Sequence, residues 1–400
     1  MPAARNFSLD FTLPFGLASR TICLVTAVTA ETKFMRLALR LAQNAYGATS
    51  PNPMVGAVLV KGGKIIGRGW HRKAGSPHAE IEALLDAERR GHSVQGATLY
   101  VTLEPCCTHG RTPPCTDAIK TSGIKAVVVG ATDPNPSHAG KGLEILKRAG
   151  IKVTPGILAA ECSRLNAAFN HWIVTRRPFV TVKAAMTLDG KIATAKGESK
   201  WITGEPARAY GMRLRQGSDA ILVGVNTILA DDPSLTWRPV QSSKSKNPIP
   251  RLRRIVLDSQ ARTPLTAKVV RDEHAALTTI VVTRRAPKTR VNALRKKASV
   301  LVAPDKKSRI DLHWLMKKLG AENVTTLLVE GGGEVNASFL FEGLAQRVAF
   351  FYAPKILGGS AARKGVAGEG AKNLSEVVQL QEVEWHKLGA DLLLTAKVAG

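Results

Sequence analysis

Three of the five cysteines in this chain lie close together, at Cys106, Cys107 and Cys115, so any fold must accommodate a dense group of thiols. Cys23 and Cys162 are isolated, and the total is odd. A chain of 400 residues can bury a core that needs no disulfide bonds, which argues against a disulfide framework. The thiols are therefore expected to be reduced, and a cytoplasmic location is favoured.

The alternation of helical and extended patterns predicts two α/β domains. A single core seldom grows to 400 residues, and strands alternate with helices from Glu31 onward. A helical pattern over 158–176 is followed by Arg177-Pro178, which begins a new strand, so the joint is placed near residues 172–178. We expect a first domain over residues 31–175 and a second over 176–400.

The amino-terminal 30 residues have no clear globular pattern. They contain an apolar run after Arg20 and only one acidic residue. A signal peptide is one interpretation, but a disordered extension, or a start codon assigned too far upstream, is favoured. No apolar run approaches the roughly 20 residues that span a bilayer, so no membrane partner is expected.

The net charge of +26 raises nucleic acid, anionic membranes and phosphorylated small molecules as partner classes. Residues 241–310 hold 18 Lys and Arg against 4 Asp and Glu, which is +14 of the total. The bases are mixed with Pro and Ser and have few aromatic neighbours for base stacking. A solvated basic face is therefore favoured over a nucleic-acid site, and no function follows for this stretch.

A catalytic zinc site is the best interpretation of the thiols. His78, Cys106 and Cys115 supply one imidazole and two thiolates, and three protein ligands leave a tetrahedral zinc with one open position. Glu80 lies two residues after His78 at a predicted helix start, where it could transfer protons. A fourth ligand would close the metal, and Cys107 and His109 are the candidates for that alternative.

The order H-x-E followed by P-C and a second Cys is the signature of zinc-dependent base and nucleoside deaminases. Polynucleotide deaminases have two residues between their cysteines, whereas eight separate Cys106 from Cys115 here. The longer loop brings His109, Arg111 and Thr112 toward the metal, where they could contact a substrate phosphate or ring.

Further motifs occur along both halves of the chain. They are "SPNPMVGAVLV", "HAE", "TLEPC", "HGRTPPC", "DPNP", "VTVKAAMTLDGKIATAKGESKWITG", "ILVGVNTILADDPSLTWR", "IVLDS" and "VEGGGEVNASFL". With these motifs, from about residue 31 nearly to the carboxyl terminus, the chain resembles the bifunctional deaminase/reductase family of riboflavin biosynthesis. The resemblance implies a cytidine-deaminase-like three-layer domain followed by a dihydrofolate-reductase-like domain.

The resemblance also implies substrates and cofactors. A diamino-ribosylamino-pyrimidinone 5′-phosphate is deaminated with one Zn²⁺ per chain, and the ribosyl chain of the product is reduced with NADPH. His78, Cys106 and Cys115 match the zinc ligands, Glu80 the proton shuttle, and Asn52 the pocket lining. Cys107 stands where Ser is expected. A homo-oligomer is expected.

The second half lacks G-x-G-x-x-G, so an ordinary Rossmann fold is not predicted. Gly331, Gly332 and Gly333 follow an apolar strand and open a helix, and their N–H groups could face a diphosphate or simply form a turn. By resemblance, the cofactor-binding positions are Met186, Trp201, Thr227, Asp231, Ser259, Gly332 and Gly333, and the substrate-binding positions are Lys183, Ser199, Arg215, Leu235, Arg238 and Glu330.

Side-chain chemistry supports only some of the roles that the resemblance implies for this half. Arg215 and Arg238 suit a phosphate clamp, and Glu330 suits the orientation of ribose hydroxyls. No residue is an obvious proton donor. Two rival functions remain: an RNA base deaminase with a basic accessory domain, and a non-catalytic zinc-stabilised interaction protein.

Overall fold

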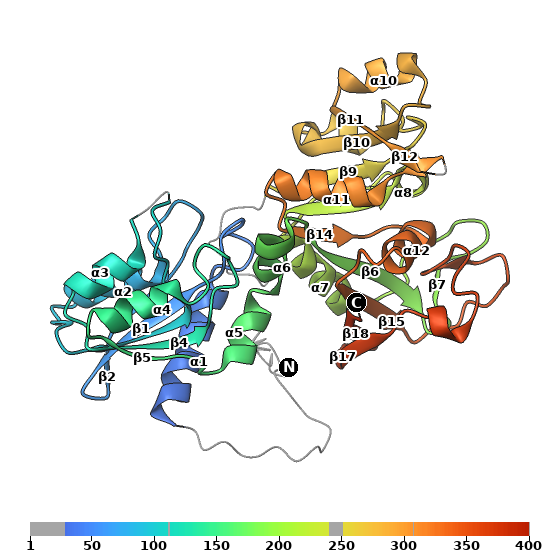
Figure 1. Ribbon diagram of the computed structural model, residues 1–400. Coiled ribbons are helices and arrows are strands. Elements are labelled where there is room, and N and C mark those ends of the chain that lie inside the picture. Colours follow the sequence, from blue (N-terminus) through green and yellow to red (C-terminus); the bar gives the residue numbers. More distant parts are fainter. Residues whose placement is uncertain (1–28, 111–112, 240–250, 307, 400) are drawn as a thin grey trace, which may run out of the picture.

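The computed structural model describes residues 29–110, 113–239, 251–306 and 308–399 (Figure 1). The expected extension over residues 1–30 lies almost entirely outside the described residues. The first helix, α1, runs over Ala30–Gln43, which agrees with a globular start near Glu31. Thr29 caps it by accepting a hydrogen bond from the Thr32 N–H. None of the described helices is both long and apolar enough to cross a membrane.

The first half of the chain is a three-layer α/β unit. Its five-stranded sheet has the order β2-β1-β3-β4-β5, in which β1 pairs antiparallel with β2 and β3, and β3, β4 and β5 are parallel. Helices α1 and α5 cover one face, and α2, α3 and α4 cover the other (Figure 1). The bounds are β1 Gly56–Lys61, β2 Lys64–Trp70, β3 Thr98–Leu103, β4 Ala126–Ala131, β5 Lys152–Thr154, α2 Ala79–Arg89, α3 Cys115–Thr121, α4 Lys141–Arg148 and α5 Ala159–Leu165.

Glycines let the helices approach this sheet closely. A Cβ on Gly56 would lie 2.0 Å from the Ala38 carbonyl oxygen of α1, and one on Gly69 would lie 2.3 Å from the Ala79 carbonyl oxygen of α2. Neither contact leaves room for a methyl group. The position of the amino-terminal end of α2, which carries His78 and Glu80, therefore depends on Gly69.

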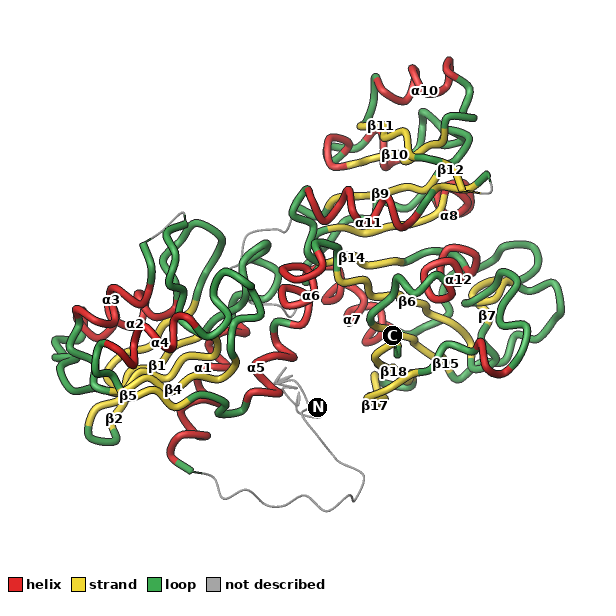
Figure 2. The backbone as a smooth tube through the Cα atoms, viewed as in Figure 1, coloured by secondary structure: helices red, strands yellow, loops and turns green. Residues whose placement is uncertain are grey.

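The second half is built on a nine-stranded sheet with the order β11-β10-β9-β8-β14-β6-β15-β18-β17 (Figure 2). Its first seven strands are parallel, and the β17–β18 hairpin adds to β15 in antiparallel fashion. The strand bounds are β6 Phe179–Thr187, β8 Ala220–Gly224, β9 Arg253–Leu257, β10 Thr278–Thr283, β11 Ser299–Ala303, β14 Thr326–Val329, β15 Arg347–Ala353, β17 Leu380–Leu388 and β18 Asp391–Val398.

Seven helices and two short strand pairs complete the described part of this half. The helices are α6 Ala167–Thr175, α7 Glu205–Gln216, α8 Val225–Asp231, α9 Lys268–Arg271, α10 Lys288–Arg295, α11 Leu312–Ala321 and α12 Gly333–Phe341. The strand pairs are β7 Lys191–Ala193 with β16 Arg363–Lys364, and β12 Asp305–Lys306 with β13 Arg309–Ile310; two 3₁₀ turns cover Ala275–Leu277 and Leu374–Glu376.

The joint between the halves differs from the prediction in one respect. The single helix expected over 158–176 is two helices, α5 and α6, separated at Asn166. The Asn166 side chain accepts from the Met54 N–H (2.8 Å) and donates to the Met54 carbonyl (2.9 Å), which fixes the break against the first sheet. In α6, the Trp172 indole donates to the Gly320 carbonyl at 2.9 Å, so the joint is anchored on both sides.

A second contact joins the loop after α1 to the end of α7. The Tyr46 hydroxyl donates to the Arg213 carbonyl at 3.3 Å, and a Cβ on Gly217 would lie 2.1 Å from that hydroxyl oxygen. Ser50 and Thr325 share a hydrogen bond of 3.2 Å between their hydroxyls. The two halves are therefore packed together through residues outside the helix α6.

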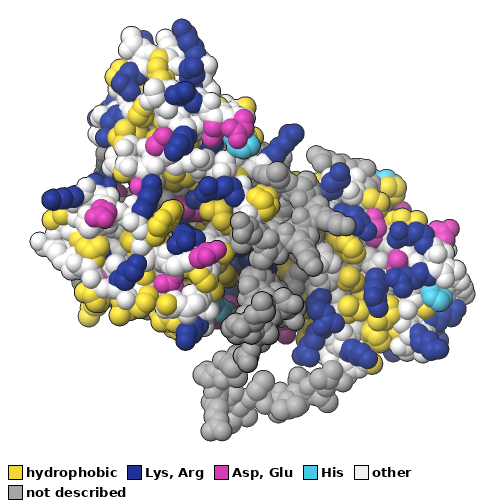
Figure 3. Space-filling model, turned by 180° about the vertical axis from the view of Figure 1, so that it is seen from behind, with side chains coloured by type: hydrophobic (Ala, Val, Ile, Leu, Met, Phe, Trp, Pro, Cys, Tyr) yellow, Lys and Arg dark blue, Asp and Glu magenta, His cyan; other side chains and the backbone are white. Residues whose placement is uncertain are grey.

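The basic stretch forms the outer end of the second half, around α10 (Figure 1). Residues 274–304 contain seven Lys and Arg and no acidic residue, and all seven side chains are exposed. Figure 3 shows Lys and Arg on the surface of this lobe. Over residues 274–304 the arrangement agrees with the solvated basic face that was favoured from the sequence, whereas Arg254 of the same stretch is completely buried. Residues 241–250 and 307 of the stretch lie outside the described residues.

Replacing Gly69 with Ala is expected to lower the free energy of unfolding by about 1–3 kcal/mol, because α2 must move away from the sheet. Gly211→Ala in α7 is the matched control, since a Cβ there meets no atom within 4 Å and Ala favours a helix. Urea unfolding of the two variants measures the difference. Equal stability of both variants would contradict the close-packing argument.

Candidate active sites

The structure brings His78, Cys106 and Cys115 together. His78 caps α2, Cys106 follows β3, and Cys115 is the first residue of α3. The His78 Nδ1 lies 3.4 Å from the Cys106 Sγ and 3.3 Å from the Cys115 Sγ. All three ligand atoms lie within 4.8 Å of one another, which is the spacing that one metal ion requires.

The electrostatics of this group suit a cation. Hydrogen bonds from Cys115 and from His78 lower the pKa of the Cys106 thiol to about 4. The same interaction with Cys106, together with burial, raises the pKa of Cys115. The hydrogen bond to Cys106 also raises the pKa of His78. A thiolate is therefore present at neutral pH, and the donor set of two sulfurs and one imidazole nitrogen fits zinc.

The alternative fourth ligands are not part of this group. Cys107 turns toward His138, whose Nδ1 lies 3.7 Å from the Cys107 Sγ and 3.4 Å from the Cys107 backbone nitrogen. His109 is exposed, and Arg111 and Thr112 lie outside the described residues. Among the described residues, three side chains of this group could hold a metal ion, and a tetrahedral ion held by three protein ligands would have one position left for another ligand.

Glu80 lies beside the thiols in the first turn of α2 and is only 3% exposed. Its carboxyl group interacts electrostatically with both Cys106 and Cys115. Burial and the negative charge of Cys106 raise the pKa of Glu80 to about 7. A carboxyl group with such a pKa can both accept and release a proton near neutral pH.

Asn52 reaches the metal group through His71. The Asn52 Nδ2 donates to the His71 Nε2 at 3.1 Å, because the His71 Nδ1 donates to the Pro77 carbonyl at 3.1 Å. The His71 ring packs edge-on against His78, with ring centres 5.2 Å apart. Sequence reasoning missed His71. The signal was its place directly after the hairpin strand β2.

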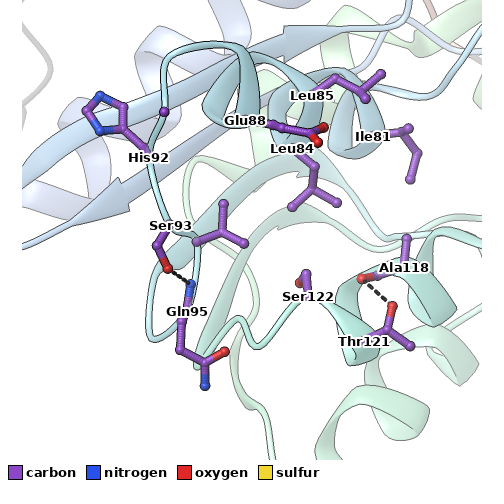
Figure 4. Close-up of a pocket in the computed structure, with 12 residues that line it drawn as sticks. Ile81, Leu84, Leu85, Glu88, His92, Ser93, Gln95, Ala118, Thr121 and Ser122 are labelled. Atoms are coloured by element: carbon purple, nitrogen blue, oxygen red, sulfur yellow. Dashed lines mark hydrogen bonds between the residues drawn. The ribbon is translucent and has the colours of Figure 1, made fainter.

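A separate groove of about 760 Å³ lies between α2 and α3 (Figure 4). Its wall includes Ile81, Leu84 and Leu85 of α2, of which Leu84 also packs against the core of the first sheet and Leu85 is exposed. It includes none of the predicted site residues. The groove therefore reflects packing of the two helices and not the metal site.

A second polar cluster forms where β14 ends in the other half. The Glu330 carboxylate accepts two hydrogen bonds from Arg215, of 2.8 and 2.9 Å, and lies 3.5 Å from the Lys183 Nζ. The Arg215 and Glu330 side chains are 13% and 12% exposed. Arg215 also donates to the Thr236 carbonyl at 2.9 Å. Three predicted substrate-binding residues thus meet in one charged group.

This cluster changes the interpretation of Arg215. Three of its N–H groups already donate to the Glu330 carboxylate and the Thr236 carbonyl. Arg215 therefore has few donors left to bind a phosphate. Arg238, its predicted clamp partner, is exposed. The phosphate clamp stays a prediction. The ionised form of Glu330 is stabilised by its neighbours. Burial alone would raise the pKa of this carboxyl group, but the positive charges of Arg215 and Lys183 outweigh burial and lower the pKa to about 2.

The other predicted positions of this half vary in exposure. Ser199 donates to Asp231 at 3.3 Å, which joins one substrate and one cofactor position. The Leu235 side chain is 3% exposed and belongs to the hydrophobic core, so only its main chain is left for a ligand. Met186 is buried, Thr227 and Ser259 are half-buried, and Trp201 is 67% exposed.

The glycines precede and begin α12, as predicted. Gly332 caps the helix and Gly333 is its first residue. A Cβ on Gly333 would lie 2.3 Å from the Lys364 carbonyl oxygen, and its own carbonyl accepts from the Ala367 N–H at 3.1 Å. Gly333 is therefore required for packing, whereas a Cβ on Gly332 would meet no atom within 4 Å.

Two family matches cover the two halves. Residues 28–131 match the cytidine and deoxycytidylate deaminase zinc-binding region, and residues 178–394 match the RibD C-terminal domain. The chain is 44% identical to the riboflavin biosynthesis protein RibD of Actinobacillus pleuropneumoniae over 90% of this chain and 93% of that protein. It is 45% identical to RibD of Aquifex aeolicus over 92% of this chain and 98% of that protein.

Solved structures of this family agree over more than nine-tenths of the chain. Acinetobacter baumannii RibD superposes with a TM-score of 0.81 at 35% identity, covering 93% of this chain and 99% of that one. The diaminohydroxyphosphoribosylaminopyrimidine deaminase/5-amino-6-(5-phosphoribosylamino)uracil reductase of Thermotoga maritima gives 0.78 at 35% identity, covering 92% and 99%. The fold predicted from the sequence, with its two different α/β halves, is confirmed.

Glu330→Gln is expected to lower the free energy of unfolding at pH 7 by about 3 kcal/mol, because a pKa depressed from 4.5 to about 2 stabilises the folded state. This contribution is complete above about pH 5 and is lost as the pH falls from 4.5 toward 2. Urea unfolding at pH 7, 5 and 4 should show a constant difference from wild type and then a smaller one.

Glu384→Gln is the control, since that carboxylate is 67% exposed and is expected to change stability by less than about 0.5 kcal/mol. A Glu330→Gln difference that grows on acidification would contradict the depressed pKa.

Proposed function

This chain belongs to the RibD family of riboflavin-biosynthesis proteins, and on that premise we propose which residues perform its two reactions. It is a bifunctional enzyme. A zinc-dependent deaminase removes the amino group of a diamino-ribosylamino-pyrimidinone 5′-phosphate, and an NADPH-dependent reductase then converts the ribosyl chain to ribityl. We assign deamination to residues 31–175 and reduction to 176–400.

The group of His78, Cys106 and Cys115, with all ligand atoms within 4.8 Å, is the observation that carries the deaminase assignment. These residues would hold zinc, with both thiols deprotonated in the loaded site. Zinc supplies Lewis acidity that makes water a nucleophile near neutral pH. The fold contributes the rest, because α2, α3 and the end of β3 hold the three donors in place.

Glu80 is the proposed proton shuttle. Its buried carboxyl, with a pKa of about 7, accepts a proton from the attacking water and passes it to the departing ammonia. The aromatic C–NH₂ becomes C=O, one water is consumed and one ammonia is released. Asn52 is the proposed substrate contact, oriented by its donation to His71 at 3.1 Å.

In the second half, NADPH supplies the hydride. Glu330 is proposed to accept from ribosyl hydroxyls, and Lys183, 3.5 Å away, to donate to the substrate. Arg215 keeps Glu330 ionised and in place through two hydrogen bonds. Ser199 and the loop with Leu235 and Arg238 complete the proposed substrate side.

The cofactor side is proposed on the same basis. Met186, at the end of the central strand β6, would lie near the nicotinamide, and the backbone at Gly332 and Gly333 near the diphosphate. Asp231, held by Ser199, links the cofactor and substrate positions. The remaining proposed cofactor contacts are Trp201, Thr227 and Ser259.

The rival of an RNA base deaminase is not favoured. The RibD relatives match this chain over both halves, and a second half of this kind has no role in base deamination of RNA. A cytoplasmic location is proposed, because the four cysteines among the described residues are free thiols. A homo-oligomer is also proposed, because the edge strand β17 exposes Val383 and Trp385.

Glu80→Gln is expected to reduce ammonia release by about 10²–10⁴-fold, because the proton shuttle is lost. The assay supplies the diamino-pyrimidinone phosphate and follows ammonia and then NADPH absorbance. Zinc content should be unchanged, and NADPH consumption should recover when the deaminated intermediate is supplied. Glu82→Gln on the same helix is the control, and an equal loss there would argue against a specific role of Glu80.

Zinc stoichiometry tests the ligands themselves. Wild type and Cys107→Ser are expected to bind one zinc per chain, because the Cys107 thiol contacts His138 and not the metal group. Cys106→Ser and Cys115→Ser are expected to lose the zinc. Metal analysis of the purified chains measures this, and loss of zinc in Cys107→Ser alone would transfer the ligand role to Cys107.

A further inference from the structure

Arg254 is the largest completely buried side chain among the described residues. It lies on β9, where strand alternation places it on the same face as Leu252 and Val256, inside the core that also holds Leu235. Removing a guanidinium from water is costly, and an apolar side chain of similar volume would fill this core at least as well. The polar contacts of Arg254 therefore need a separate explanation.

Every N–H of this guanidinium has an acceptor. Two N–H groups donate to the Asp272 carboxylate, at 2.6 and 2.8 Å. The Nε donates to the Thr278 hydroxyl at 2.8 Å, and one Nη2 N–H donates to the Val269 carbonyl at 3.0 Å. The fifth donates to the Ser234 carbonyl at 2.9 Å. Four of these contacts lie within residues 269–278, and only the bond to Ser234 reaches a proposed ligand-binding segment.

Ser234 belongs to the loop over residues 232–238, which follows α8 and ends at the proposed substrate-binding residue Arg238. The loop contains two residues with positive φ, Asp232 at 39° and Leu235 at 53°. Such conformations cost free energy in non-glycine residues and persist only where the surroundings fix them. With its side chain in the core, Leu235 can offer a ligand only its main chain, so the position of the loop backbone matters at this residue.

Two arginines hold the carbonyls on either side of Leu235. Arg254 donates to the Ser234 carbonyl at 2.9 Å, and Arg215 donates to the Thr236 carbonyl at 2.9 Å. Arg215 also carries the Glu330 carboxylate of the proposed substrate site. The loop is thus held at the Thr236 carbonyl by Arg215 of the proposed site and at the Ser234 carbonyl by Arg254 of the buried core.

We propose that Arg254 is a positioning residue of the reductase site, which fixes the Ser234 carbonyl and thereby the main chain of loop 232–238 for the phosphorylated substrate. This role rests on the proposed function. Arg254 touches neither substrate nor cofactor in it; the residue acts through the loop. Asp272 and Thr278 orient the guanidinium from the other side.

The test uses the full chain with Arg254→Met and Asp272→Asn combined, so that no carboxylate is left unpaired. We expect the KM for the deaminated substrate to rise about tenfold or more, with kcat within about threefold of wild type. Ammonia release by the other half should stay within about twofold, which shows that the chain is folded and active. Amides of residues 234–238 should exchange hydrogen faster.

Thr278→Val is the matched control, because it removes one acceptor of Arg254 from the same buried cluster and leaves the bond to Ser234. It should lower the melting temperature without changing the KM or the exchange of residues 234–238. The proposal is wrong if Thr278→Val raises the KM as much as the double variant does, or if the double variant leaves KM and exchange unchanged.

If the double variant does not fold, Arg254→Lys takes its place. The Lys ammonium group has too few donors for all the acceptors around Arg254. The same rise in KM and in hydrogen exchange is therefore expected. An unchanged KM overturns the proposal. Failure of the reductase assignment gives a different result. In that case wild type consumes no NADPH with the deaminated substrate, while hydrogen exchange still reports whether Arg254 fixes the loop.

Discussion

Both candidate sites depend on the parallel register of the central strands. In a parallel sheet the carboxyl ends of neighbouring strands meet at one edge, and the loops that follow them share that edge. Cys106 follows β3, which is paired in parallel with β4. Glu330 follows β14, which lies between β8 and β6. The two halves thus use the same edge of two different sheets for different chemistry.

Buried charges fix the loops at these edges. The Glu104 carboxylate, 3% exposed, accepts from the backbone N–H groups of Asp133, Gly140 and Gly142 at 2.9 to 3.1 Å, which ties the segment after β4 to the end of β3. In the second half, Arg215 and Arg254 have the same effect on the carbonyls of loop 232–238. A buried charge with all its partners satisfied rigidifies its surroundings, and the loss of one partner is costly.

The two halves are also connected close to both sites. The loop that contains Tyr46 and Asn52 packs on the end of α7 through the Tyr46 hydroxyl. Asn52 reaches the metal group through His71, and Arg215, in the last turn of α7, reaches Glu330. The contact between Tyr46 and α7 is therefore made by chain segments that also carry Asn52 of the proposed deaminase site and Arg215 of the proposed reductase site.

The sequence by itself was enough to predict the group of His78, Cys106 and Cys115 that could hold a metal ion, the proposed proton shuttle Glu80, the two α/β halves and most helices and strands. Those features depend on residue type and local spacing, as in H-x-E, P-C and the alternation of apolar strands with amphipathic helices. Tertiary structure alone decided that Arg215 is paired with Glu330, that Leu235 lies in the core, and that Asn166 splits one predicted helix into two. Each of these depends on a partner far away along the chain, and local spacing carries no information about such partners.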